Sequence, residues 1–136
     1  MAQAGSPAPV VLSSPCSTVA DLHYRNIPVV DGDAASRKRL AEWLISSGHF
    51  VLTAASSADA LTYLMETDVD LVITEYSMGR VSGQQWLKFL DEHYRRAEVL
   101  IVTNLPSRMV RTRHPILRKP LALGDLQEHM SSLASA

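Results

Sequence analysis

Residues 71–75, Leu-Val-Ile-Thr-Glu, form a short apolar run that ends on a carboxylate, and this run constrains the fold more than any other stretch. Three adjacent apolar residues, two of them β-branched and bounded by polar residues, are typical of a strand buried in a parallel sheet. Open α/β sheets place their binding sites beyond the carboxyl ends of their strands. We therefore expect Glu75 to lie at a functional site.

Strand patterns and amphipathic helix patterns alternate from residue 27 onward. We expect strands at 27–30, 49–54, 70–74, 98–102 and 115–118, and helices at 34–47, from 57, at 83–94 and from 123. Asp33 and Ser57 are expected to cap the first two helices, and Gly48 to end the first. This alternation predicts an α/β fold of flavodoxin-like type, a doubly wound parallel sheet of five strands with helices on both faces.

Several side chains carry more specific structural expectations. Pro28 lacks an N–H, so we expect it at the start of its strand or opposite a gap in the ladder. Trp43 and Trp86 are expected in or at the edge of the core. The second helix is expected to carry Leu61, Leu64 and Met65, and Leu126, Met130 and Leu133 are expected to face inward in the last helix.

Composition and charge exclude several classes of protein. The 136 residues suffice for one domain, and a formal net charge of -1 gives no bulk attraction to nucleic acid or anionic membrane. No apolar run approaches the roughly 18 residues that span a bilayer. Cys16 is the single cysteine and cannot form an internal disulfide, which favours a reducing, cytoplasmic location. Residues 1–24 are expected to be a flexible extension or linker, in which residues 10–12, Val-Val-Leu, have a short strand pattern, and residues 25–136 form the domain.

Five segments occur in a characteristic order and spacing. They are Val29-Val30-Asp31-Gly32-Asp33, the run from Asp70 to Glu75, Met78 with Ser82-Gly83, Ile101-Val102-Thr103, and Lys119-Pro120. Together they resemble the receiver domains of two-component response regulators, over about residues 27–134. The resemblance implies strand order 2-1-3-4-5, transfer of a phosphoryl group from a phosphohistidine to an aspartate after the third strand, and Mg²⁺ held by two acidic residues after the first.

The resemblance also assigns roles by position. Asp31 and Gly32 stand where the acidic pair belongs, and Glu75 stands at the phosphoacceptor. Thr103 occupies the position of the hydroxyl that binds the phosphoryl oxygen, and Lys119 that of the lysine that pairs with carboxylate and phosphate.

The departures from the family pattern bear on function. Glu75 replaces the aspartate and Gly32 replaces an acid, while Asp33 is displaced by one residue and, as a helix N-cap, points elsewhere. Gly79 replaces a proline, and Ile116 occupies the place of the switch aromatic. The span from the fourth to the fifth strand is about six residues shorter than usual, so the helix between them is expected to be shortened or missing.

These departures act against phosphoryl transfer. The loss of one carboxylate at residue 32 should weaken Mg²⁺ binding, so no cofactor is expected. The extra methylene of Glu75 displaces its oxygen by about 1.5 Å, and a displacement of about 1 Å costs on the order of a hundredfold in rate. The longer carboxylate also reaches toward Thr103 and Lys119, where it partly imitates a phosphoryl group. Alternatively, Glu75 and Lys119 are a structural ion pair and Thr103 is a polar strand end.

A basic stretch without an acidic residue lies between Glu98 and Asp125. It includes Arg108, Arg111, Arg113 and Arg118, which with Ile116 form a candidate docking surface for an acidic protein surface. The alternative is a solvated loop. Direct nucleic-acid binding is not expected, because no aromatic residues are interspersed among these basic residues.

The sequence therefore predicts a non-enzymatic pseudo-receiver that works by contact with a histidine kinase or another signalling protein. It is either a stand-alone regulator or part of a hybrid histidine kinase, and a homodimer stays open. The alternatives are a phosphoaccepting receiver with an unusual pocket and a small-ligand-binding flavodoxin-like module.

Overall fold

The structure is a computed structural model that describes residues 26–78 and 81–135. The expected extension at 1–24, its strand pattern at 10–12 and Gly79 therefore lie outside the described residues, as does the side chain of Leu133.

Five parallel strands form one sheet. The strands are β1 (Asn26–Val30), β2 (Phe50–Ala54), β3 (Leu71–Thr74), β4 (Glu98–Thr103) and β5 (Ile116–Arg118). Their order across the sheet is β2-β1-β3-β4-β5, which confirms the predicted topology. Pro28 lies inside β1, and the register between β1 and β3 begins one residue later, at Val29, so the missing N–H lies outside the regular pairing with β3.

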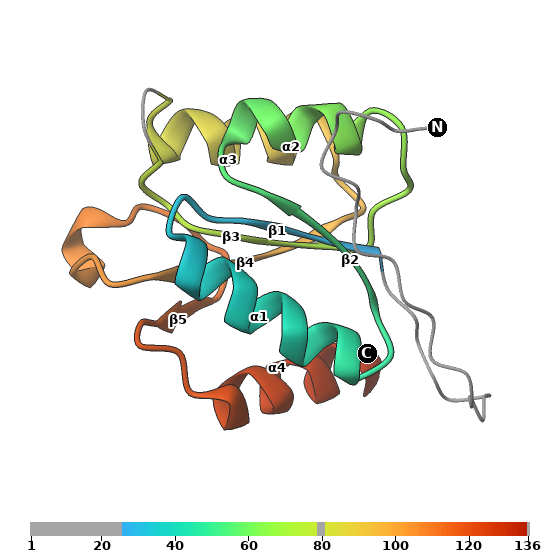
Figure 1. Cartoon of the computed structure of the whole chain (residues 1–136). Helices are drawn as coiled ribbons and strands as arrows, with labels where there is room; N and C mark the ends of the chain where they lie inside the picture. The colour runs from blue at the N-terminus through green and yellow to red at the C-terminus, as the bar shows by residue number, and fades with distance from the viewer. Residues whose placement is uncertain (1–25, 79–80, 136) are drawn as a thin grey trace.

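Helices cover both faces of this sheet. They are α1 (Ala34–Ser46), α2 (Ser57–Leu64), α3 (Gly83–His93) and α4 (Leu123–Ser135), and η2 (Ser107–Met109) is a short 3₁₀ turn. Figure 1 shows α2 and α3 on one face and α1 and α4 on the other. None of the helices in the described part of the chain is long and apolar enough to cross a membrane.

The two faces of the sheet enclose two apolar clusters. On the side of α1 and α4, Leu44, Leu126 and Met130 pack against the strands, with Trp43 half-buried beside them. On the side of α2 and α3, the cluster includes Trp86, which is 3% exposed. Both tryptophans therefore lie where the sequence placed them.

The helix ends follow the capping pattern with one shift. Asp33 caps α1 as expected, because its side chain accepts from the backbone N–H of Ala35. The cap of α2 is Ser56 rather than Ser57: Ser56 has an extended backbone and accepts from Asp59 N. With Ser57 as the cap, α2 would begin at Ala58; it begins one residue earlier, at Ser57.

The helix α2 packs on the sheet through Ala60 and Leu64, which are buried, whereas Leu61 is half-buried and Met65 is 76% exposed. Met65 is the C-cap of this helix of 8 residues, so it lies past the part that packs on the sheet. Leu61 and Leu64 therefore lie in α2 as expected, and Met65 lies at its end.

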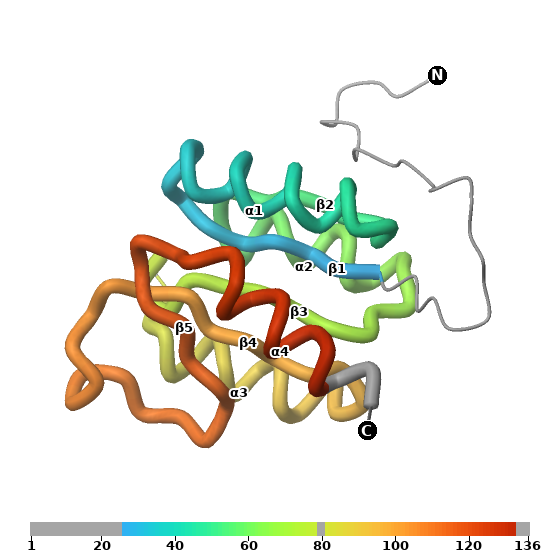
Figure 2. Tube along the Cα trace, turned by 90° about the horizontal axis from the view of Figure 1, so that it is seen from below, coloured from blue at the N-terminus to red at the C-terminus, as the bar shows by residue number. Residues whose placement is uncertain are grey.

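The connection between β4 and β5 contains no α-helix in the described structure, only η2. Val110 is buried among residues of the α3 side, and His114 Nε2 lies 2.8 Å from Asp91 Oδ1 of α3. The Arg118 guanidinium donates to the Leu105 carbonyl and to the Ser107 hydroxyl. Figure 2 shows this connection extending past β5, and its contacts replace those of the missing helix.

Candidate functional site

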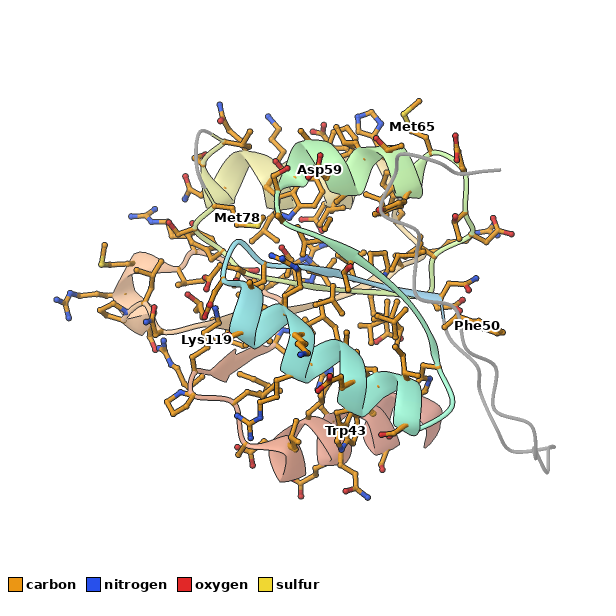
Figure 3. The ribbon with its side chains drawn as sticks, viewed as in Figure 1. Trp43, Phe50, Asp59, Met65, Met78 and Lys119 are labelled. Carbon is orange, nitrogen blue, oxygen red and sulfur yellow. The ribbon has the colours of Figure 1, made fainter. Side chains whose placement is uncertain are left out.

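A cleft opens where the strands end at their carboxyl side. It has a volume of about 610 Å³, and Asp31, Glu75 and Lys119, which follow β1, β3 and β5, line it. Figure 3 shows Lys119 at this end of the sheet, beside the start of α1. The three residues that the sequence placed together by position therefore lie in one cleft.

Lys119 joins the two carboxylates. Its Nζ lies 2.8 Å from Asp31 Oδ2 and 2.9 Å from Glu75 Oε1. Burial alone would lower the pKa of the Lys119 ammonium, but the hydrogen bonds that it donates to Asp31 and Glu75, and the charges of these two residues, raise it above its usual value. The ammonium is thus held in its charged form between two buried acids.

The second carboxylate oxygen of Glu75, Oε2, faces the backbone that follows β3. Glu75 Oε2 accepts from Tyr76 N at 2.8 Å and from Ser77 N at 3.3 Å. The residue is 8% exposed, and these backbone donors satisfy its buried charge together with Lys119. The carboxylate is fixed by three contacts.

A buried polar network behind Glu75 was not anticipated from the sequence. Trp86 Nε1 donates to Thr74 Oγ1 at 2.9 Å, and the Thr74 hydroxyl donates to the carbonyl of Glu75 at 2.9 Å. An indole N–H in a core normally finds a polar partner, so Trp86 on an apolar helix face was the available signal. This network ties α3 to the turn that carries Glu75.

The carboxylates of Asp31 and Asp33 bind different partners. Asp31 Oδ1 accepts from Asp33 N at 2.9 Å, which leaves its other oxygen to Lys119. Asp33 lines the cleft, but its oxygens accept from Ala35 N at 3.2 Å and from the Ser36 hydroxyl at 2.8 Å. The hydrogen bond from Ser36 lowers the pKa of Asp33. Asp33 is therefore committed to the start of α1, as its N-cap position indicated.

Thr103 does not join the carboxylate cluster. The residue is fully buried, and its Oγ1 accepts from Leu105 N at 3.2 Å. No hydrogen bond links Thr103 to Glu75 in the described residues, so the expected contact between them was wrong. The Glu75 carboxylate points to its own following amides and to Lys119 instead, and the Thr103 hydroxyl closes the turn after β4.

Further residues that line the cleft come from the loops at the same edge. They are Ala55, Ser56, Ser57, Ala58, Ser77, Met78, Val81 and Asn104, together with Gly32. Most of them carry no motif that singles them out in the sequence, although each follows a strand at the edge where the site was expected. Their position immediately after β2, β3 and β4 was the usable signal.

The candidate docking residues divide into two groups. Arg108, Arg111 and Arg113 are exposed on the connection between β4 and β5. Ile116 is half-buried against the α3 side of the core, and Arg118 is engaged with Leu105 and Ser107. The first group presents free positive charge, and the second braces the connection.

An all-parallel sheet in this order, with two acids and a lysine converging at its carboxyl ends, is the architecture of a CheY-like α/β domain. The chain belongs to the response regulator receiver domain family, whose model matches residues 27–130. It is thus a receiver domain of two-component signalling, a class of module that interacts with signalling proteins such as histidine kinases.

Solved structures agree with this assignment. A signal receiver domain of an HD domain-containing protein from Pseudomonas fluorescens Pf-5 superposes with a TM-score of 0.74 at 20% identity, covering 81% of this chain and 94% of that one. The chemotaxis response regulator CheY4 of Vibrio cholerae gives a TM-score of 0.73 at 20% identity, covering 81% and 98%. A receiver domain protein from Clostridium thermocellum gives 0.71 at 26% identity, covering 82% and 94%. Among curated proteins, none matches the chain.

Proposed function

We propose that this domain is a pseudo-receiver, which signals by protein contact without accepting a phosphoryl group. One observation carries the proposal: the Glu75 carboxylate at the phosphoacceptor position is held by Lys119 Nζ at 2.9 Å and by Tyr76 N at 2.8 Å. A phosphoryl group would have to displace these contacts or react with an oxygen that is already engaged.

The oxygen atoms available as ligands argue against binding of Mg²⁺, the ion that the family implies. Both oxygens of Asp31 and both of Glu75 already have partners, and Asp33 is bound to the start of α1. Gly32 supplies no ligand. Within the described residues, no three His, Cys, Asp or Glu side chains are grouped to hold a metal ion. Since Mg²⁺ requires near-octahedral oxygen ligation, we expect weak binding or none.

The pocket has a fixed shape rather than a switched one. Glu75 takes the contact with Lys119 that a phosphoryl group would make, but it carries one charge where phosphate carries about two, and the Thr103 hydroxyl bonds to Leu105 N instead of to Glu75. The imitation of the phosphorylated state is therefore partial, and we expect one resting conformation at this site.

Partner contact is assigned to Arg108, Arg111 and Arg113. Their exposure and the absence of any acid between Glu98 and Asp125 favour an acidic protein surface. The partner class is a histidine kinase or another signalling protein in the cytoplasm, including the kinase core of the same chain if the domain is part of a hybrid kinase.

The test is phosphorylation with acetyl phosphate and Mg²⁺, followed by intact mass. The unchanged chain should gain no mass. The matched variant carries Glu75→Asp with Gly32→Asp, and it should gain one phosphoryl group because it restores the acidic pair and the shorter acceptor.

This variant is expected to fold. A Cβ at residue 32 would meet the Ala55 carbonyl oxygen at 3.6 Å, an ordinary contact. Addition of a phosphoryl group to the unchanged chain, at Glu75 or at a neighbour such as Ser77, would instead establish a phosphoaccepting receiver with an unusual pocket.

A further inference from the structure

The edge strand β2 presents backbone groups that the described residues do not pair. Asp31 N donates to the Ala54 carbonyl at 3.0 Å, so the backbone of Ala54 faces β1. Successive residues of a strand direct their N–H and C=O groups to opposite sides. Val51 and Thr53 therefore direct theirs to the outer side, where β2 has no neighbour in the described sheet.

The burial of this edge makes the unpaired groups informative. Val51 is 0% exposed, although it lies in an edge strand, and Thr53 is half-buried. Buried backbone N–H and C=O groups are almost always hydrogen-bonded in native proteins. A strand from outside residues 26–78 and 81–135 would satisfy the outward groups of Val51 and Thr53, which have no partner in the described sheet.

A groove runs along the same edge. Its volume is about 550 Å³, and it is lined by Leu52 and Thr53 of β2, by Arg37 of α1 and by Thr62 and Tyr63 of α2. Figure 1 shows β2 in front of the sheet, between α2 and α1. A groove beside an open strand edge suits an extended peptide, which pairs its backbone with the strand and seats alternate side chains.

We propose that residues 9–13 of this chain, Pro-Val-Val-Leu-Ser, bind this edge as an antiparallel strand. The segment contains two β-branched residues, Val10 and Val11, and Leu12, a composition that favours strands. It is uncharged, so it meets the mixed charges of Arg37, Asp59 and Glu66 along the groove without repulsion.

The chain path permits this pairing. Asn26, the first residue of β1, is in register with Phe50, the first residue of β2, so the segment must return to this end of the sheet. Residues 13–25 can span up to about 43 Å when extended, whereas two strand spacings amount to about 10 Å. A segment antiparallel to β2 would finish beside Phe50, at the end of the sheet where β1 begins. A segment parallel to β2 would finish at the opposite end, and the chain would then have to run back along the sheet to reach Asn26.

The pairing would also act on the cleft. Ala55 lines both the groove and the cleft, and it immediately follows β2. A strand paired to Thr53 would therefore hold the turn from β2 to α2, which forms one wall of the cleft. This effect is independent of whether Glu75 accepts a phosphoryl group.

Amide hydrogen exchange of the full chain tests the proposal. The variants Val10→Pro and Val11→Pro each remove one backbone donor, and one of the two donors faces β2 in either register. We expect the Val51 and Thr53 amides to exchange at least about tenfold more slowly in the unchanged chain than in one of these variants, which is about 1.4 kcal/mol of local protection. Ala4→Pro, in the same extension, is the matched control and should leave the exchange unchanged.

Two outcomes overturn the proposal. Exchange of Val51 and Thr53 at the same rate in the unchanged chain and in both proline variants would show that residues 9–13 do not cover the edge. Protection that rises with protein concentration would assign the edge to a second copy of the chain. All three proline positions precede β1, the first strand of the described sheet, so the variants leave residues 26–78 and 81–135 unchanged.

Discussion

Lys119 balances two acids at the base of the cleft. Asp31 and Glu75 are 5% and 8% exposed, and each lies within 2.9 Å of the same ammonium. A buried carboxylate is tolerated only when charges and hydrogen bonds replace its hydration. The Lys119 ammonium therefore compensates the charges of both buried carboxylates, so its loss should matter more than the loss of either acid.

Removal of that cation should destabilise the fold. Lys119→Met keeps the length of the side chain and leaves two buried carboxylates facing each other, so we expect a loss of about 3 kcal/mol in the free energy of unfolding. Urea unfolding with an unchanged m-value checks this. Lys88→Met, an exposed lysine on α3, is the control and should change the value by less than about 0.5 kcal/mol.

The same lysine predicts a dependence on alkaline pH. Its pKa in the folded state lies above the usual 10.5, so its stabilisation is fully present below pH 10.5 and is lost as pH rises through the folded-state value. The difference in free energy of unfolding between the unchanged chain and Lys119→Met should thus stay constant up to about pH 10 and shrink above it. A constant difference through this range would mean that Lys119 is not stabilised by its two partners.

The residues of the site were predictable to different degrees. Asp31, Glu75 and Lys119 follow strands at one edge of a parallel sheet, so topology alone brings them together. The hydroxyl of Thr103 follows a strand too, but its hydrogen bond is with Leu105 in its own turn. The position of a backbone atom follows from the strand order, whereas the direction of a side chain depends on local rotamers and on competing donors.

At the scale of elements, α1 offers a direct test of what Asp33 does. An N-cap asparagine serves nearly as well as aspartate, and alanine does not. We expect Asp33→Ala to lower the free energy of unfolding by about 1 kcal/mol and Asp33→Asn to lower it by less than about 0.5 kcal/mol. Equal losses for the two variants would indicate that the charge of Asp33 serves the cleft rather than the helix.

The start of α3 depends on a close approach at Gly83. A Cβ at this position would lie 2.6 Å from the ring of Tyr76 and 2.6 Å from its carbonyl oxygen. Gly83→Ala should therefore destabilise the domain by about 2 kcal/mol, because the turn after Glu75 must move. In the matched variant Gly124→Ala, a Cβ meets nothing within 4 Å, and the helix should gain up to about 1 kcal/mol. Thermal unfolding of the two variants gives shifts of opposite sign if both statements hold.

Element positions were predicted to within a residue or two, and the exceptions have physical causes. Two adjacent serines stand at the start of α2, and both satisfy the preference for a cap, so sequence alone does not choose between Ser56 and Ser57. The short helix α2 packs through Ala60 and Leu64, so of the three larger apolar residues expected in it only Leu64 is buried. The loss of the helix between β4 and β5 was predicted correctly, since chain length limits what fits there.

At the scale of the whole molecule, charge is distributed unevenly over a nearly neutral domain. The connection between β4 and β5 carries Arg108, Arg111 and Arg113 exposed, and His114 and Arg118 attach it to α3 and to its own start. A basic surface that is held in place costs less conformational entropy on binding than a free loop does. In place of a helix, the connection between β4 and β5 therefore presents a positively charged surface that side-chain contacts hold in position.

Charge reversal on this face is the test of docking. Arg108→Glu with Arg111→Glu should weaken binding to the proposed signalling partner at least about tenfold and reduce the salt dependence of the dissociation constant. Arg95→Glu with Arg96→Glu makes the same change in net charge at exposed residues after α3 and should change binding less than about twofold. Titration calorimetry with that partner at two salt concentrations measures both. Equal weakening by the two pairs would mean that binding responds to net charge alone, and the connection between β4 and β5 would then not be the docking surface.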